Sequence, residues 1–318
     1  MEPTFREFLS KLSDMDAPIP LDQMSLLSDL DQRQLNEIAD IWLQISASRR
    51  TVLLEHCGRL ADENIELLFE ALNRFALTDP AASVRTQAVR NLWECETLDL
   101  VPLFLASLTE AESPEERSAA AEALGRFVYL AEMGDLTESL QESLETALLH
   151  AVRADSDKDV RRRSLAALGY SARPDVAPFI SQFYSGEAEE DQLAALLAMG
   201  RSADNRWDET VRLALKHVSP SIRIQAARAA GELELSSAVE ELVELLSDID
   251  SRIQAAAIWS LGQIGGERAR EALLFIEPGD DETLADLIEQ ALEHLAFVEG
   301  SDDFLFLDVQ ENEEGPLS

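Results

Sequence analysis

The chain lacks any long apolar run. No stretch of about 18 consecutive apolar residues occurs, which is the length that a helix needs to cross a bilayer. The first residues, MEPTFREFLSKLSDMD, also lack the basic start and apolar core of a secretion signal. We therefore expect a cytoplasmic protein that has no membrane partner.

Basic residues are scarce. The 318 residues contain 26 Lys and Arg against 62 Asp and Glu, which gives a formal net charge of −36. Such a field repels phosphate backbones and anionic lipids. The composition thus excludes a basic groove for nucleic acid and favours protein partners, most naturally ones with a basic surface.

Residues that carry chemistry are also few. The two cysteines, Cys57 and Cys95, stand 38 residues apart and in no CxxC pair, so we interpret them as small buried hydrophobes in a reducing compartment. No HExxH, P-loop, GxGxxG or GxSxG motif occurs. The four histidines are spread over the chain, at His56, His150, His217 and His294. We therefore predict no catalytic residue, no metal and no cofactor.

Aromatic residues make up only 6% of the chain, and Ala and Leu dominate its apolar set, a composition that favours closely packed helices. A repeat is present instead. Four small-residue-rich segments, each ending in glycine, recur at intervals of 31 residues; their glycines are Gly169, Gly200, Gly231 and Gly262. A period in this range indicates a solenoid, in which each unit buries its apolar face against its neighbours.

Each repeat is predicted to be a hairpin of a first and a second helix. Small residues at the centre of the first helices, such as Ala226 and Ala257, should let neighbouring helices approach closely. We interpret the terminal glycine as a left-handed cap that ends each first helix. Leu168, Leu196, Leu261 and Leu292 should be buried between layers.

Helix starts follow from local signals. Asp31 is predicted to cap a helix carrying Ile38 and Trp42 on one face. Asp79 and Pro80 should begin another, with Asp79 as the N-cap. Between Gly125 and Gly169 the spacing stretches to 44 residues, which predicts a longer second helix or an inserted loop.

The segment 79–92 has the pattern D-P-x-x-x-V-R-x-x-A-x-x-x-L, and 155–169 and 219–231 are similar. This pattern resembles the HEAT repeat, and its Ala-rich 31-residue form resembles the subtype first named for phycobilisome lyases. The resemblance implies an all-α, right-handed α-solenoid of stacked helical hairpins. It further implies that the second helices line a concave binding face.

Three regions are expected. Residues 1–46 should form an N-terminal helical cap, 47–298 the solenoid, and 299–318 an acidic flexible tail. Within the solenoid, residues 281–295 are predicted to form the first helix of a last repeat, which has no clear second helix and caps the C-terminal end of the stack. In the tail, Phe304 and Phe306 would lie on one side of an extended segment and anchor a partner.

The repeat register brings several polar and apolar residues of the second helices together. Glu209, Glu240 and Glu271 occupy equivalent positions, so stacking should align them in an acidic column suited to Lys or Arg of a partner; a solvated helix face is the alternative. One turn further, Leu213, Glu244 and Phe275 form a second column. Trp207 and Arg212 are neighbouring candidate anchors, although Trp207 fits a core position equally well.

These observations predict a non-enzymatic scaffold or adaptor that binds a protein partner. Two alternatives stay open. The resemblance to phycobilisome lyases implies a subunit of a bilin-chromophore lyase, although the generic repeat occurs in many bacterial proteins with other roles. The strong negative charge would also suit an acidic mimic of nucleic acid. Deoxyhypusine hydroxylases are a class of repeat enzymes that hold iron through His-Glu pairs. This chain has only two such pairs, Glu55-His56 and Glu293-His294, and both are in reversed order.

Overall fold

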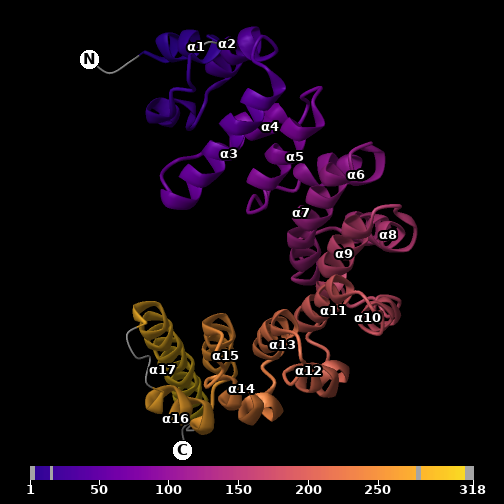
Figure 1. Ribbon diagram of the computed structural model, residues 1–318, viewed down its shortest axis with the longest axis vertical. Coiled ribbons are helices and arrows are strands. Elements are labelled where there is room, and N and C mark those ends of the chain that lie inside the picture. Colours follow the sequence, from indigo (N-terminus) through magenta and orange to yellow (C-terminus); the bar gives the residue numbers. More distant parts are fainter. Residues whose placement is uncertain (1–3, 15–16, 277–280, 312–318) are drawn as a thin grey trace, which may run out of the picture. The chain divides into compact units, whose positions relative to one another are not determined.

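A computed structural model describes the backbone of residues 4–14, 17–276 and 281–311, and the side chains of these ranges up to residue 297. The described part of the chain is helical and contains no strand, as predicted. It divides into two compact units, Met1–Ser171 and Ala172–Ser318, which we call unit 1 and unit 2 and describe separately (Figure 1).

Unit 1 begins with α1 (Phe5–Ser13), a 3-10 turn η1 (Leu21–Leu27) and α2 (Gln32–Trp42). The predicted cap of α2 is confirmed. The Asp31 carboxylate accepts the Gln34 amide N–H at 2.8 Å, and the Gln34 side-chain oxygen accepts the Asp31 N–H at 3.0 Å. These two bonds satisfy donors that the start of a helix would otherwise leave unpaired.

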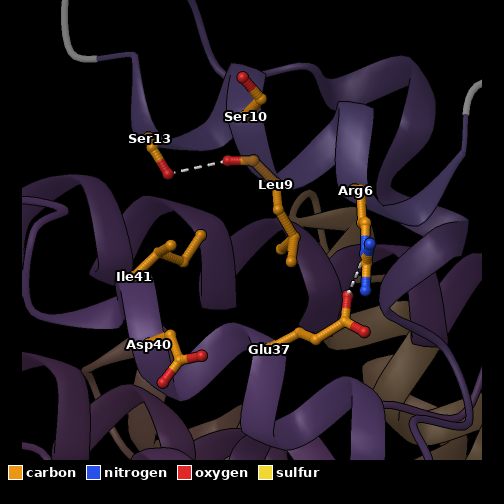
Figure 2. A pocket seen from close by; sticks show the side chains of 7 residues that line it. All are labelled: Arg6, Leu9, Ser10, Ser13, Glu37, Asp40 and Ile41. Atoms are coloured by element: carbon orange, nitrogen blue, oxygen red, sulfur yellow. Dashed lines mark hydrogen bonds and ion pairs between the residues drawn. The ribbon is translucent and has the colours of Figure 1, made fainter.

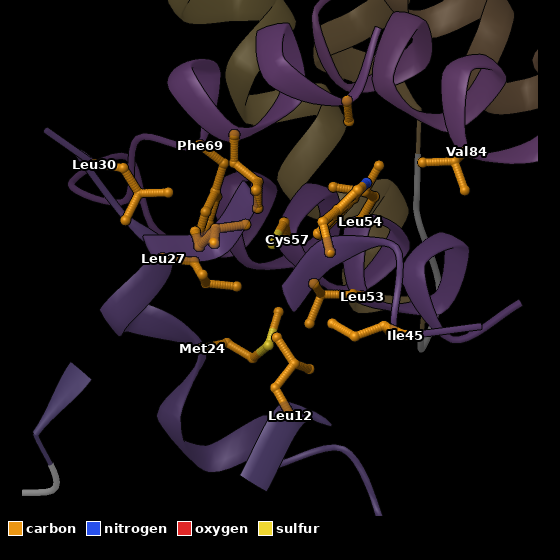
Figure 3. Packing of buried hydrophobic residues seen from close by; sticks show 14 of the residues in the cluster. Leu12, Met24, Leu27, Leu30, Ile45, Leu53, Leu54, Cys57, Phe69 and Val84 are labelled. Atoms are coloured by element: carbon orange, nitrogen blue, oxygen red, sulfur yellow. The ribbon is translucent and has the colours of Figure 1, made fainter. Parts of the chain in front are cut away.

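The N-terminal helices pack against the first repeat of unit 1. Figure 3 shows this cluster of fully or nearly fully buried side chains. Its members include Leu12, Met24 and Leu27 from the N-terminal segment and Leu53, Leu54 and Cys57 from α3 (Ala47–Glu63). The segment therefore removes the apolar side of α3 from water, which is the dominant stabilising contribution in a fold of this kind.

The rest of unit 1 alternates first and second helices. They are α4 (Glu70–Ala76), α5 (Ala82–Asn91), α6 (Leu100–Glu110), α7 (Pro114–Glu132), α8 (Glu138–Ala154) and α9 (Lys158–Ala167), followed by η2 (Leu168–Tyr170). The stretched spacing is explained by longer helices, because α7 has 19 residues and α8 has 17.

The predicted N-cap at Asp79 is wrong. Helix α5 begins at Ala82, and its cap residue is Ala81, which has no side-chain cap. The Asp79 carboxylate is engaged elsewhere: Arg50 Nε and Nη2 donate to its two oxygens at 2.8 Å each. The indole N–H of Trp42 donates to the same carboxylate at 2.6 Å. Asp79 thus joins α2, α3 and the start of α5.

Unit 2 continues the alternation. Its helices are α10 (Ala177–Tyr184), α11 (Glu189–Arg201), η3 (Asn205–Trp207), α12 (Asp208–Ala214), α13 (Pro220–Glu232), η4 (Ser236–Ala238), α14 (Val239–Leu245), α15 (Ser251–Ile264), α16 (Glu267–Phe275) and α17 (Glu282–Glu311). The backbone of α17 is helical to Glu311, whereas an extended segment was expected from residue 301. Residues 312–318 of the predicted tail lie outside the described residues.

One hydrogen bond recurs in six repeats. Near the start of each first helix, an Arg or Gln side chain donates to the backbone carbonyl six residues earlier, at 2.7 to 3.0 Å. The donors are Arg85, Arg117, Arg161, Gln192, Arg223 and Gln254. The bond satisfies a carbonyl in the turn that precedes the helix.

The repeated glycines do not cap their helices, so that prediction is wrong. Gly200, Gly231 and Gly262 lie inside α11, α13 and α15. A Cβ atom added at Gly200 would lie 2.9 Å from the Cα atom of Ala229 on the next first helix. The glycines are needed because neighbouring helices nearly touch there. The left-handed backbone falls three residues later, at Ala203, Glu234 and Gly265.

These close contacts set the curvature of each unit. The first helices pack on one another along a row, α3, α5, α7 and α9 in unit 1 and α11, α13, α15 and α17 in unit 2. Because glycine and alanine line the contacts, this row is the more tightly spaced one, and in Figure 1 it lies on the inner side of each unit's curve. The expectation that second helices line the concave face is therefore wrong.

The predicted interlayer leucines are mostly confirmed. Leu168, Leu196 and Leu261 are fully buried. Leu292 on α17 is partly exposed instead, because no further helix covers that side of α17 within the described residues.

Candidate interaction site on the second helices of unit 2

The predicted acidic column is present at the surface. Glu209, Glu240 and Glu271 lie in α12, α14 and α16, one on each successive second helix of unit 2. Their side chains are half to two-thirds exposed. We refer to the outer surface of these three helices as the second-helix face.

All three glutamates of the predicted column have intramolecular partners. Arg212 Nη2 donates to Glu209 at 2.8 Å, and Arg268 Nε donates to Glu240 at 2.9 Å. Arg268 also lies 3.9 Å from Glu271, so one guanidinium bridges two members of the column. The hydrogen bond from Arg268 holds the pKa of Glu240 below its usual value.

The ion pairs extend to the second predicted column. Lys216 Nζ lies 3.6 Å from Glu241 and 3.7 Å from Glu244, and Arg212 lies 4.0 Å from Glu241. The ion pairs on this face thus join five carboxylates, Glu209, Glu240, Glu241, Glu244 and Glu271, with three cations, Arg212, Lys216 and Arg268. Within this paired set the carboxylates outnumber the cations by two, so the set is acidic although its members contact one another.

Exposed apolar side chains lie among these charges. Leu213 on α12 is 62% exposed, and Phe275 at the end of α16 is 83% exposed. Leu274, which the sequence analysis did not select, is 61% exposed beside Phe275. Trp207 is only 6% exposed. It therefore belongs to the core, as the alternative interpretation of the sequence held, and is not a surface anchor. Large exposed apolar groups grouped on one surface are typical of interaction sites.

A groove opens between α16 and α17, at the end of the second-helix face. Its volume is about 480 Å³. Apolar residues of both helices line most of it, and two carboxylates stand beside them; the lining residues are Leu273, Leu274, Ile276, Ala285, Ile288, Leu292, Ala296, Glu289 and Glu293. The sequence signal for this groove was the last first helix without a second helix, but that signal was read only as an end cap.

A smaller hollow lies between α1 and α2 in unit 1 (Figure 2). It is lined by Arg6, Leu9, Ser10, Ser13, Glu37, Asp40 and Ile41. Arg6 Nε contacts Glu37 at 3.4 Å across the hollow, and this hydrogen bond lowers the pKa of Glu37. Two of its three charged side chains, Arg6 and Glu37, are thus engaged with each other, which makes it a weaker candidate than the groove in unit 2.

Metal chemistry finds no support in the described part of the chain. No group of three or more His, Cys, Asp or Glu residues there is arranged to hold a metal ion. Within the same residues, no helix combines the length and apolarity needed to cross a membrane. The side chains of Phe304 and Phe306 lie outside the described residues, so their predicted anchoring role stays a prediction.

Comparisons with known proteins agree with this architecture. The family model of HEAT repeats matches residues 208–293, which include the whole second-helix face. No curated protein matches the sequence significantly. The chain is an α-solenoid of stacked helical hairpins, and residues 208–293 carry HEAT repeats.

Among solved structures, the complex of CpcE and CpcF of phycocyanin lyase from Nostoc sp. PCC7120 is similar, with 20% identity and a TM-score of 0.50 over 72% of this chain and 95% of that one. Human deoxyhypusine hydroxylase gives 14% identity and a TM-score of 0.37 over 92% and 96%. A designed armadillo repeat protein in complex with the peptide (KR)4 gives 16% and 0.38 over 61% and 99%. At these identities the likeness concerns the fold alone.

Proposed function

We propose that this chain is a non-enzymatic scaffold that binds a partner protein through the second-helix face of unit 2. The observation that carries the proposal is the grouping of exposed Leu213, Leu274 and Phe275 with five carboxylates on successive helices. Exposed apolar side chains that alternate with charged ones provide both the anchors and the polar contacts of a protein interface.

The proposed partner has a basic surface. The ion-paired set on the face contains two more carboxylates than cations, and the whole chain carries a net charge of −36. Charges of this kind act mainly on the association rate, while buried apolar anchors set the dissociation rate. Because Glu209, Glu240 and Glu271 already contact cations, a partner's Lys or Arg must share or displace those contacts.

The first test concerns charge. Partner capture followed by mass spectrometry supplies the ligand, and its affinity is then measured at several salt concentrations. Changing Glu209, Glu240 and Glu271 together to Gln should slow association and flatten the salt dependence. The matched control changes three exposed acids of unit 1, Glu55, Glu63 and Glu66, to Gln. Equal effects of both triple variants, or an unchanged affinity at low salt, would contradict the acidic-column proposal.

The second test concerns the apolar anchors. Phe275→Ser and Leu213→Ser should each weaken binding about tenfold or more, chiefly through faster dissociation. Ile65→Ser in unit 1 is the control, because Ile65 is 92% exposed and is not part of the proposed face. If the control weakens binding as much as Phe275→Ser, the location of the interface is wrong.

A chromophore-lyase subunit is the second candidate. Its support is the shared fold with the phycocyanin lyase complex, which by itself transfers no activity. Mixing the chain with phycocyanin, with and without free bilin, and following the visible absorption tests this candidate. A bilin-dependent change in the spectrum would favour it over a purely non-enzymatic scaffold.

A further inference from the structure

Helix α17 holds the place of a first helix in the repeat. A Cβ atom added at Gly262 would lie 2.9 Å from Ala291 Cβ on α17, just as one at Gly231 would lie 3.0 Å from Ser260 Cα on α15. The earlier first helices of unit 2 are followed by α12, α14 and α16. No such helix follows α17 in the part of the chain that the structure describes, so within that part no second helix covers this side of the α16–α17 groove.

One position of the 31-residue repeat is buried in three repeats of the chain and partly exposed in the next. Met199, Ala230 and Leu261 stand 31 residues apart and are all fully buried. The next member of the series, Leu292, is partly exposed and lines the groove. An apolar position that is sealed in three repeats is therefore open to solvent in the fourth.

The charges beside the groove differ from those of the second-helix face. Between residues 282 and 297 the sequence contains four acids, Glu282, Asp286, Glu289 and Glu293, and no Lys or Arg. None of these four carboxylates has an ion-pair partner among the described residues. In contrast, Glu209, Glu240 and Glu271 contact Arg212 or Arg268. These four carboxylates are thus available to external cations.

We propose that the α16–α17 groove binds a short amphipathic helix of the partner protein, with its apolar side against Leu274, Ile288 and Leu292 and its Lys or Arg residues against Glu289 and Glu293. This inference rests on the proposed scaffold function and names the partner's chemistry. The second helices of unit 2 have 7 to 9 residues, so an insert of two to three turns fits the vacant position.

A second copy of this chain is a poorer occupant. Each copy carries a net charge of −36, and two such surfaces repel each other unless apolar contacts outweigh the repulsion. A basic helix avoids that cost and adds attraction. Charge complementarity therefore selects a partner helix over self-association.

The test uses the full chain and two labelled 14-residue peptides with the same Leu pattern, one with Lys and one with Glu on its polar side. Fluorescence anisotropy should detect the Lys peptide and not the Glu peptide. Ala296→Lys, at an exposed position that lines the groove, should weaken Lys-peptide binding about tenfold or more. Glu289→Gln with Glu293→Gln should weaken it and reduce its salt dependence.

The control is Glu55→Gln with Glu63→Gln, at two exposed positions of unit 1, which removes the same charge outside the groove and should leave peptide binding nearly unchanged. Equal loss in both double variants would mean general attraction to an acidic chain and would overturn the proposal. So would absence of Lys-peptide binding, or a dimer seen by sedimentation that Ala296→Lys abolishes. If partner capture is lost with Phe275→Ser but survives Ala296→Lys, the scaffold proposal stands and the groove inference fails.

Discussion

At the scale of single residues, the most consequential group is the buried carboxylate of Asp79. Arg50 and Asp79 are almost completely removed from solvent, with 5% and 0% of their side chains exposed. Arg50 also donates to the backbone carbonyl of Ile45 and stacks 5.7 Å from the ring centre of Trp42. A buried pair of this kind contributes little compared with an apolar replacement, but removing one partner leaves a charge without compensation.

We expect Asp79→Asn to lower the free energy of unfolding by about 3–5 kcal/mol, because it leaves the Arg50 guanidinium buried and unneutralised. Urea denaturation followed by circular dichroism measures the change. The comparison variant is Asp99→Asn, which removes a carboxylate bonded to Arg74 at 2.9 Å but 71% exposed; its midpoint should move little. Similar shifts in both variants would show that the buried network has no special role.

The two cysteines should differ in reactivity. Cys57 is fully buried, and burial raises its pKa to about 12. Cys95 is half-buried; burial also raises its pKa, while a hydrogen bond with Thr97 acts in the opposite direction. Because the thiolate is the reacting form, native protein at pH 8 should be alkylated slowly at Cys95 and not at Cys57. Mass spectrometry of the labelled peptides checks this, and rapid labelling of Cys57 would mean that its cluster opens readily.

At the scale of helices, the decisive feature is the approach between neighbouring first helices. Gly200→Ala would place a methyl group 2.9 Å from the backbone of Ala229, which forces α11 and α13 apart. We expect a loss of about 1–3 kcal/mol, as in other overpacked cores, although alanine is the better helix former. Ser221→Ala, at an exposed position of α13, is the control and should be neutral or slightly stabilising. A stabilised Gly200→Ala variant would mean that the helices separate without cost.

The sequence predicted this packing only in part. The period of 31 residues, the small residues and the helical hairpins followed from the pattern around Gly231 and Gly262, since periodicity survives in the sequence itself. The role of those glycines could not be predicted from the pattern. A glycine that ends a helix and a glycine that contacts a neighbouring helix give the same sequence signal. Asp79 was misassigned for a similar reason: its partner Arg50 lies 29 residues away.

The candidate site was also predicted in part. The register of Glu209, Glu240 and Glu271 correctly placed them on successive second helices, because equivalent positions in a repeat share one environment. Their pairing with Arg212 and Arg268 depends on side-chain conformations, which spacing alone does not specify. The α16–α17 groove could be recognised only in the structure, because it depends on Leu292 being left uncovered by other helices of the described chain.

At the scale of the whole molecule, the net charge of −36 is the dominant property. Self-repulsion among so many carboxylates opposes the compact state, and salt screens it over a Debye length of about 8–10 Å at 0.1–0.15 M. We expect the melting temperature to rise by several degrees between about 10 and 150 mM NaCl, as measured by circular dichroism. The same experiment in sucrose, which raises no ionic strength, separates screening from general stabilisation. A melting temperature that falls with salt would mean that the ion pairs outweigh the repulsion.

The hydrogen bonds from an Arg or Gln side chain to the carbonyl six residues earlier bear on how such a chain can gain or lose repeats. Each of them, from Arg161 to Gln254, closes within its own repeat, so a repeat carries its own turn with it when copied or lost. Removing residues 217–247 takes out both Arg223 and its acceptor His217, and would set Ser260 beside Gly200 in place of Ala229, again a small side chain at the crossing. The shortened chain should remain folded and helical in circular dichroism, whereas removing 25 residues from the same point should not. A chain of this architecture can therefore be lengthened or shortened only by whole repeats.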